Sequence, residues 1–387
     1  MGSFKGAIRS GILLLALVAF SLPARADVTT ERSSSILIFP KVIATASSPS
    51  APANIDTIIQ ISNTSNSMAF AHCYYVNAAP LDPTSPPSAS NPPLCQEVDF
   101  DIYLTKQQPT HWLVSTGRRV QIDTPEDKLC FSRYGASFMG CFGAGLDPGG
   151  IPPVPDVFTG ELRCIEVDSS GAPINGNHLK GEATIVTADG DASKYNAVGV
   201  MGLNTNTNSN NGDDTLCLGG ASSGSCPTGA EYNACPAKLI LNHFAMGASD
   251  PVLDELLGSS SSVDTDLTLV PCTQDFQNQI PGRGVIQFLL INEFEEVFST
   301  STTISCWATF PLTQVNSVFS TGILGTRFVQ TRMTPVPTGD GLQSGFVGVA
   351  EEYHFPPGST SSSRAAANLH GEGQNQSGDL ITIMGSF

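Results

Sequence analysis

The chain has few basic residues: 18 Lys and Arg stand against 35 Asp and Glu, and the formal net charge is −17. Binding to nucleic acid depends on a basic surface that neutralises phosphates, so this balance excludes nucleic acid as a partner. An acidic surface favours solubility and is compatible with divalent cations. The expected partners are therefore proteins, glycans or cations.

Long apolar runs and helix signals are also scarce. The run within Gly11–Leu22 is too short to span a bilayer as a helix. It follows Lys5 and Arg9 and precedes Ala24-Arg25-Ala26, a small-x-small cleavage pattern. Residues 1–26 are therefore predicted to be a secretory signal peptide. We expect no membrane span and an exported mature chain, either periplasmic or extracellular.

The ten cysteines include no Cys-x-x-Cys pair, which argues against a redox motif and against the usual zinc spacing. An even number of cysteines in an exported chain predicts disulfides. Proximity in the sequence favours Cys73 with Cys95, Cys130 with Cys141, and Cys272 with Cys306. The pairing of the remaining four cannot be ordered from the sequence: Cys164, Cys217, Cys226 and Cys235.

Catalytic signatures are missing as well. Residues 220–224 match Gly-x-Ser-x-Gly, but they lie in a Gly/Ser loop with no helix after it, whereas the mechanism needs a strand–turn–helix context. The six histidines show no paired spacing, and His243 is the least easily explained of them. We predict a non-enzymatic protein. A hydrolase site assembled across domains around His243 is a third hypothesis.

Two series of landmarks run through the chain in the same order. The segment Asp56–Ser62 resembles Gly284–Leu290, and an apolar run ending in proline precedes each copy. A cysteine, a Leu-Thr pair, a Ser-Thr-Gly triplet, a Gly-led strand and a polar segment then follow each copy; these last segments are residues 178–182 and 368–372. Because the spacings differ mainly where loops are expected, the pattern predicts a tandem repeat.

Short alternating strands with many turns predict an all-β fold of two tandem antiparallel Ig-like β-sandwich domains with a disulfide-rich insert. The predicted domains are 27–202 and 261–387, joined by a polar, cysteine-rich connector at 203–260. Within the connector, Lys238–Phe244 is predicted to be a strand within or beside the first domain. Asp250–Leu257 is the one helix that the sequence suggests.

Acidic side chains offer weak metal-site candidates. Asp189, Asp191, Asp213 and Asp214 lie in two polar loops that could hold calcium, although turn chemistry explains them equally well and neither loop fits the EF-hand pattern. The cluster of Glu293, Glu295 and Glu296 alternates with Phe294 as on an exposed strand, so a solvated hairpin is favoured over paired catalytic carboxylates. No cofactor other than calcium is suggested.

Several segments resemble those of uncharacterised exported β-rich proteins of Gram-negative bacteria. They are Phe158–Cys164, His178–Thr184, Asn292–Glu295 and Gly348–His354. The resemblance covers most of the mature chain and implies export and a shared fold. It implies no activity.

Tandem domains, disulfides and long polar loops favour a structural, adhesive or protein-interaction role at the cell envelope or surface. The alternative is a carbohydrate-binding or calcium-dependent ligand-binding module. In that alternative, Trp112 and the pair Tyr74-Tyr75 would form a stacking platform for sugars, although packing in a core explains them more simply.

Overall fold

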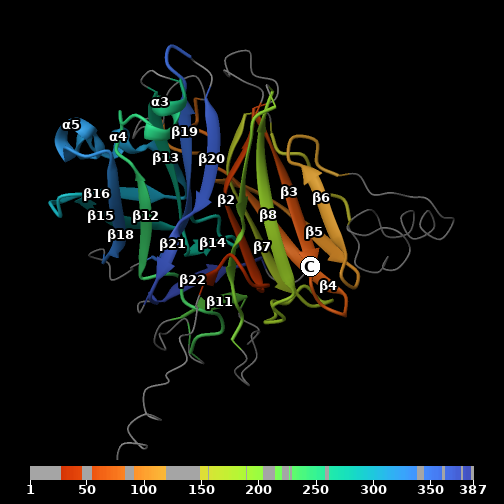
Figure 1. Cartoon of the computed structure of the whole chain (residues 1–387). Coiled ribbons are helices and arrows are strands. Elements are labelled where there is room, and N and C mark those ends of the chain that lie inside the picture. The colour runs from red at the N-terminus through yellow and green to blue at the C-terminus, as the bar shows by residue number, and fades with distance from the viewer. Residues whose placement is uncertain are drawn as a thin grey trace, which may run out of the picture.

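The described part of the chain is all-β, with strands as its main elements, as predicted (Figure 1). The structure is a computed structural model, and it describes residues 28–45, 55–82, 91–118, 149–155, 157–188, 190–203, 214–219, 226, 229–257, 261–337, 344–359, 362–375 and 378–384. Residues 1–26, Cys130, Cys141, Asp189, Asp213 and the segment 220–224 lie outside the described residues. The predictions made for them therefore remain predictions.

The first half of the chain forms two facing sheets. Sheet A has the order β1-β10-β2-β7-β4-β5, with bounds Val28–Thr29, Val198–Val200, Ile36–Ala44, Phe158–Val167, Ala69–Asn77 and Gln96–Leu104. Sheet B has the order β6-β3-β8-β9, with bounds Pro109–Leu113, Ile55–Asn63, Leu179–Thr187 and Ala192–Asn196. Their inner faces share one apolar core that includes Phe39, Ile59 and Trp112. Burial of this core is the main force that holds the two sheets together.

The second half forms another facing pair. Sheet C has the order β17-β13-β19-β20, with bounds Ala308–Pro311, Ser262–Pro271, Phe346–Phe355 and Ser363–Asn368. Sheet D has the order β16-β15-β18-β12-β21, with bounds Val297–Ser305, Arg283–Asn292, Phe328–Val336, Lys238–Phe244 and His370–Glu372. Leu269, Phe288 and Met333 are among the residues of the core between these sheets. The short helices α3 (Pro251–Leu257), α4 (Leu312–Val315), η2 (Ser317–Phe319) and α5 (Thr321–Leu324) lie in this half.

A fifth sheet and a third core join the halves. Sheet E has the order β11-β22-β14, with bounds Thr215–Leu218, Asp379–Thr382 and Gln274–Asp275, and its β14–β22 pair is parallel. It belongs to an apolar cluster on the outer side of sheet A that includes Tyr74, Ile165 and Phe276. Sheet A is therefore covered on both faces. This agrees with the nearly uninterrupted burial of β2, β4 and β7.

The structure does not clearly show the two Ig-like domains in series that the sequence predicted. The sheets give a jelly-roll-like arrangement with a shared core between the halves. The repeat agrees with part of the topology, because β2 pairs with β7 as β13 pairs with β19, while β3 and β15 lie in the facing sheets B and D. It diverges after the repeated strand. The chain crosses to sheet A for β4, but it turns back within sheet D for β16.

Strand β12 corrects a second expectation. Residues 238–244 were predicted to lie within or beside the first domain, yet β12 pairs with β18 and β21 in sheet D. Its alternating pattern buries Leu239, Leu241 and His243 against the second core. Alternation predicts a strand, but it does not say which sheet supplies the hydrogen-bonding partners. The predicted helix is confirmed as α3, Pro251–Leu257.

Two of the three predicted disulfides have the right cysteines but the wrong partners. Cys73 pairs with Cys164, and Cys95 pairs with Cys306, so the predicted Cys73–Cys95 and Cys272–Cys306 bridges are wrong. The other two described bridges are Cys217–Cys226 and Cys235–Cys272. Cys73 and Cys164 lie directly opposite each other on β4 and β7. For this pair, proximity across the sheet decides the partner although the two cysteines are 91 residues apart.

Buried polar groups also fix the joint between the halves. Lys41 Nζ lies 2.7 Å from Glu351 Oε2, and Ser193 and Tyr353 donate to the same carboxylate. Arg163 donates to Glu161 on its own strand and to the carbonyl oxygens of residues 271 and 272 in the second half, at 3.0 and 2.8 Å. Together with the Cys95–Cys306 bridge, these contacts connect the two halves.

Candidate interaction surface

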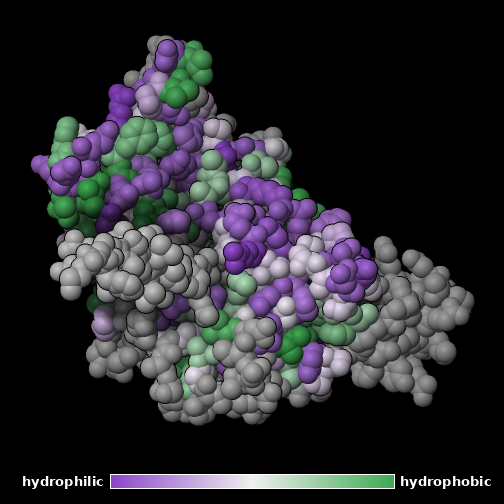
Figure 2. Space-filling view, turned by 60° about the horizontal axis from the view of Figure 1, so that its bottom comes forward, coloured by the Kyte–Doolittle hydropathy of each residue, from purple (hydrophilic) through white to green (hydrophobic). Residues whose placement is uncertain are grey.

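The outer face of sheet D carries exposed side chains along β15 and β16. Alternate residues of β15 and β16 point to the core, and those between them point outward. Leu289 is 36%, Val297 59% and Phe328 42% exposed, beside the polar outward residues Ser299 and Ser301. Figure 2 shows hydrophobic and hydrophilic side chains mixed at the left margin, where Figure 1 places β15, β16 and α5. Exposed apolar side chains grouped in this way are typical of contact surfaces.

The β15–β16 turn holds the acidic cluster as the predicted solvated hairpin. Glu293, Glu295 and Glu296 are exposed. Asn292 organises the turn, because its side-chain oxygen accepts from the backbone N–H groups of Phe294 and Glu296 at 2.9 Å each. Phe294 at the tip is 71% exposed. The cluster therefore borders the outer face of sheet D on an exposed turn.

The predicted sugar-stacking platform does not exist. Trp112, Tyr74 and Tyr75 are 3%, 0% and 1% exposed. Trp112 Nε1 donates to Tyr75 Oη at 2.6 Å inside the first core, and Tyr74 stacks on Phe276 at 3.9 Å between ring centroids. Aromatic side chains buried in this way pack cores and cannot receive a sugar face.

His243 is held as a structural residue. Its Nδ1 lies 2.7 Å from the Phe244 carbonyl oxygen, which can only accept, so Nδ1 carries the proton. Nε2 then accepts from the Thr331 hydroxyl at 2.9 Å. Burial lowers the pKa of His243 to about 4. Both ring nitrogens are hydrogen-bonded and the residue is only 3% exposed, which agrees with a structural role.

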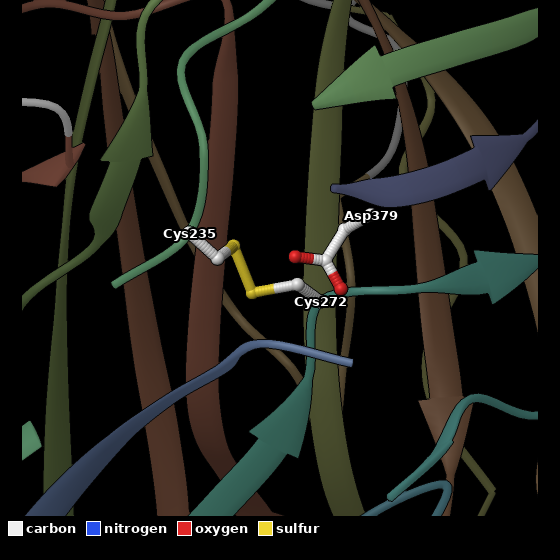
Figure 3. Close-up of side chains that lie close together, drawn as sticks. All are labelled: Cys235, Cys272 and Asp379. Carbon is white, nitrogen blue, oxygen red and sulfur yellow. A yellow bond between two sulfur atoms is a disulfide. The ribbon is translucent and has the colours of Figure 1, made fainter. Parts of the chain in front are cut away.

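Figure 3 shows the one group of three potential metal ligands that lies close together in the described part of the chain: Cys235, Cys272 and Asp379. The two sulfur atoms form a disulfide and offer no thiolate. The Asp379 carboxylate accepts from the Gly345 N–H at 2.8 Å, from the Thr273 hydroxyl at 2.9 Å and from the Asn375 amide at 3.0 Å. This group joins sheet E to sheet C and is no metal centre.

The calcium candidates that the structure describes are not brought together. Asp191 lies at the β8–β9 turn, where Oδ1 accepts from the Ala192 N–H at 3.0 Å and Oδ2 lies 4.0 Å from Arg364 Nε. Asp214 precedes β11 in sheet E. Neither belongs to a described group of three ligands. Turn and ion-pair contacts account for Asp191, so calcium remains a prediction without support from geometry.

One acidic strand was not predicted from the sequence. Glu97, Asp99 and Asp101 alternate along β5, an edge of sheet A, and His72 Nδ1 lies 2.7 Å from Asp101 Oδ1. Glu97 lines a cavity of about 240 Å³. Burial raises its pKa to about 7, against the opposing effect of a hydrogen bond from Gln274. The alternation Glu-x-Asp-x-Asp at 97–101 was the available signal.

The comparisons with known proteins show only distant structural similarity. No family model and no curated protein matches the chain. The solved structures with distant similarity include the cowpea mosaic virus top component (TM-score 0.17, 9% identity, 93% of this chain and 96% of that one), broad bean stain virus (0.16, 10%, 93% and 96%) and a Penaeus vannamei nodavirus (0.14, 11%, 82% and 96%). Likeness at this level carries no inference about function. Within the described residues, no helix is both long and apolar enough to cross a membrane.

Proposed function

We propose that this chain is an exported, non-enzymatic protein that makes protein contacts at the cell envelope or surface through the outer face of sheet D. The observation that supports the proposal is that apolar side chains are exposed on this face, whereas the histidine considered for catalysis is buried. Leu289, Val297 and Phe328 are exposed there, whereas His243 is buried with both ring nitrogens bonded. The two halves act as related sandwiches that hold this face rigid.

Export is supported by the disulfides, since four described bridges are compatible with an oxidising compartment. Rigidity supports a contact role because a surface that is already ordered loses little entropy on binding. The Cys95–Cys306 bridge and the Lys41–Glu351 pair provide that order between the halves.

The test is site-specific photo-cross-linking in cells that produce the full chain. A photoreactive residue replaces Leu289 on sheet D, and a matched probe replaces Gln60, an exposed residue on β3 of sheet B. We expect a discrete product of one identified protein with the Leu289 probe in the envelope or exported fraction. Equal products from both probes, or none from either, would overturn the proposal.

A further inference from the structure

Strand β16 forms one edge of sheet D and pairs on one side only, with β15. Figure 1 places it on the side of the molecule away from sheets A and B. Among the described residues, the backbone hydrogen bond at its outer edge lies at the end of the strand, where the Trp307 N–H donates to the Ser305 carbonyl oxygen at 2.8 Å. A nine-residue strand in this position presents a row of backbone donors and acceptors that can accept another strand.

The ladder shows which residues point their backbone groups outward. Asn292 N–H donates to the Glu296 carbonyl oxygen at 3.1 Å, and Cys306 N–H donates to the Gly282 carbonyl oxygen at 2.7 Å. Bonded and non-bonded pairs alternate in an antiparallel ladder, so the even-numbered residues of β16 bond to β15. The odd-numbered residues Val297, Ser299, Ser301 and Thr303 therefore direct their N–H and C=O groups away from β15.

The sequence of the edge lacks the residues that normally prevent strand association. Residues 297–305 read Val-Phe-Ser-Thr-Ser-Thr-Thr-Ile-Ser, with no charge and no proline. Natural edges are commonly protected by Lys, proline, a bulge or a short length. An uncharged edge matters in a chain of net charge −17, because self-association elsewhere on the surface brings like charges together.

The strand is also nearly self-complementary about Ser301. In an antiparallel pair of copies centred there, Ser301 faces Ser301, Thr300 faces Thr302, and Ser299 faces Thr303. Phe298 faces Ile304 on the core side, which covers the half-buried Phe298 ring. Ser/Thr pairs and apolar pairs directly opposite each other are favourable cross-strand neighbours. The residues at this centre have outward backbone groups, as the pairing requires.

We propose that β16 pairs antiparallel with β16 of a second copy of this chain, so that two D sheets join into one continuous sheet across a two-fold axis at Ser301. An interface of this kind is isologous, so every contact is made twice. The pairing also brings the acidic turn of one copy, with Glu295 and Glu296, toward the exposed Arg283 at the other end of the partner's hairpin. The proposal rests on the protein-contact function and names the partner.

The test measures the mass of the mature chain by sedimentation velocity over a range of concentrations, in its native and disulfide-bonded form. Ser301→Pro is the first variant. Because the Ser301 N–H points away from β15, proline there removes a donor from the outer edge and none from the β15–β16 ladder. Ser301→Lys is the second variant, because it places two like charges opposite each other at the axis. Asn242→Lys is the control, with the same charge on the same face but on the interior strand β12.

We expect a dimer in the unaltered chain and in Asn242→Lys, and a dimer dissociation constant about tenfold or more higher in both Ser301 variants, with unchanged thermal unfolding at low concentration. In Ser301→Cys, mild oxidation should give a covalent dimer, because directly opposed residues of a bonded pair lie at about 5.5 Å between Cα atoms, within disulfide reach.

Two results would overturn the self-pairing. One is a monomer at all concentrations while the Leu289 probe still captures a different protein, which leaves the contact function standing. The other is a dimer that Ser301→Pro and Ser301→Lys do not weaken. A monomer together with no product from the Leu289 probe would reject both proposals.

Discussion

Sheets A and D have the most strands of the described sheets, and they differ in how their two faces are covered. Sheet A has apolar cover on both faces, and the joint beside it buries Lys41, Glu351 and Arg163. Sheet D has a core on one face, and on the other it exposes Ser, Thr and the apolar side chains of Leu289, Val297 and Phe328. The contacts between the halves are thus buried, while the outer face of sheet D is exposed to solvent.

This difference distinguishes the residues that stabilise the fold from the residues that are available for contact with a partner. A buried ion is costly to separate from its partner, so the joint holds the two halves in one geometry. Uncharged residues on an exposed edge contribute little to folding, and they leave that edge able to pair. Perturbing the joint should therefore change unfolding, and perturbing the outer face should change association.

The largest effect should come from the bridge that joins the halves. Replacing Cys95 and Cys306 together by serine opens a link between residues 211 apart in sequence. The chain-entropy model predicts a loss of about 5 kcal/mol in the free energy of unfolding. Chemical denaturation without reductant measures it. The control removes Cys217–Cys226, which spans only nine residues and should cost less than about 3 kcal/mol. Equal losses in the two variants would show that loop length does not set the stabilisation.

The second effect tests the buried pair. Lys41→Met leaves the Glu351 carboxylate buried without its cation and should cost about 4 kcal/mol at neutral pH. Adding Glu351→Gln to Lys41→Met should recover part of that loss, because no buried charge then remains. Urea unfolding of both variants measures the difference. If the double variant is as unstable as the sum of the single ones, the two residues do not act as a pair.

The pair also sets a pH dependence. Burial by itself would raise the pKa of Glu351, but Lys41, Ser193 and Tyr353 hold it below its ordinary value. A carboxylate with a lowered pKa in the fold stabilises the protein above its unfolded pKa, about 4.3, and this contribution is lost as pH falls through the folded value. The unaltered chain should lose this stabilisation in acid, whereas the double variant should not.

How far the sequence could predict these features depends on the range of the interactions. Alternation located β3, β15 and the β15–β16 hairpin, and the segment Asp250–Leu257 was predicted as the helix that became α3, because neighbouring residues decide these features. The partner of Cys95 and the sheet that accepts β12 depend on contacts between distant segments. The non-alternating runs Ile36–Phe39 and Cys73–Val76 did carry a signal that sheet A is buried on both faces. On the surface, only the acidic turn was foreseen, since exposure of Leu289 follows from the register of sheet D.

The third effect concerns His243, which lies on the core side of sheet D. Its pKa of about 4 lies below the ordinary value of 6.5 because burial disfavours the charged form. A histidine that stays neutral in the fold makes the folded state less stable as pH falls from about 6.5 towards 4, by up to about 3 kcal/mol. His243→Gln should flatten this part of the stability curve, whatever it costs at neutral pH. Thermal unfolding between pH 7 and pH 4 measures the slope, and an unchanged slope would remove His243 as its source.

The smallest effect should lie on the outer face itself. Val297→Ser changes a residue that is 59% exposed, so the unfolding free energy of the monomer should change by less than about 0.5 kcal/mol. Ile304 on the same strand is 1% exposed, and Ile304→Ala should cost about 3 kcal/mol through the cavity that it leaves. Unfolding at low protein concentration compares the two without a contribution from association. A loss near 3 kcal/mol for Val297→Ser would mean that the outer face stabilises the monomer, and the contrast between sheets A and D would then no longer separate folding from contact.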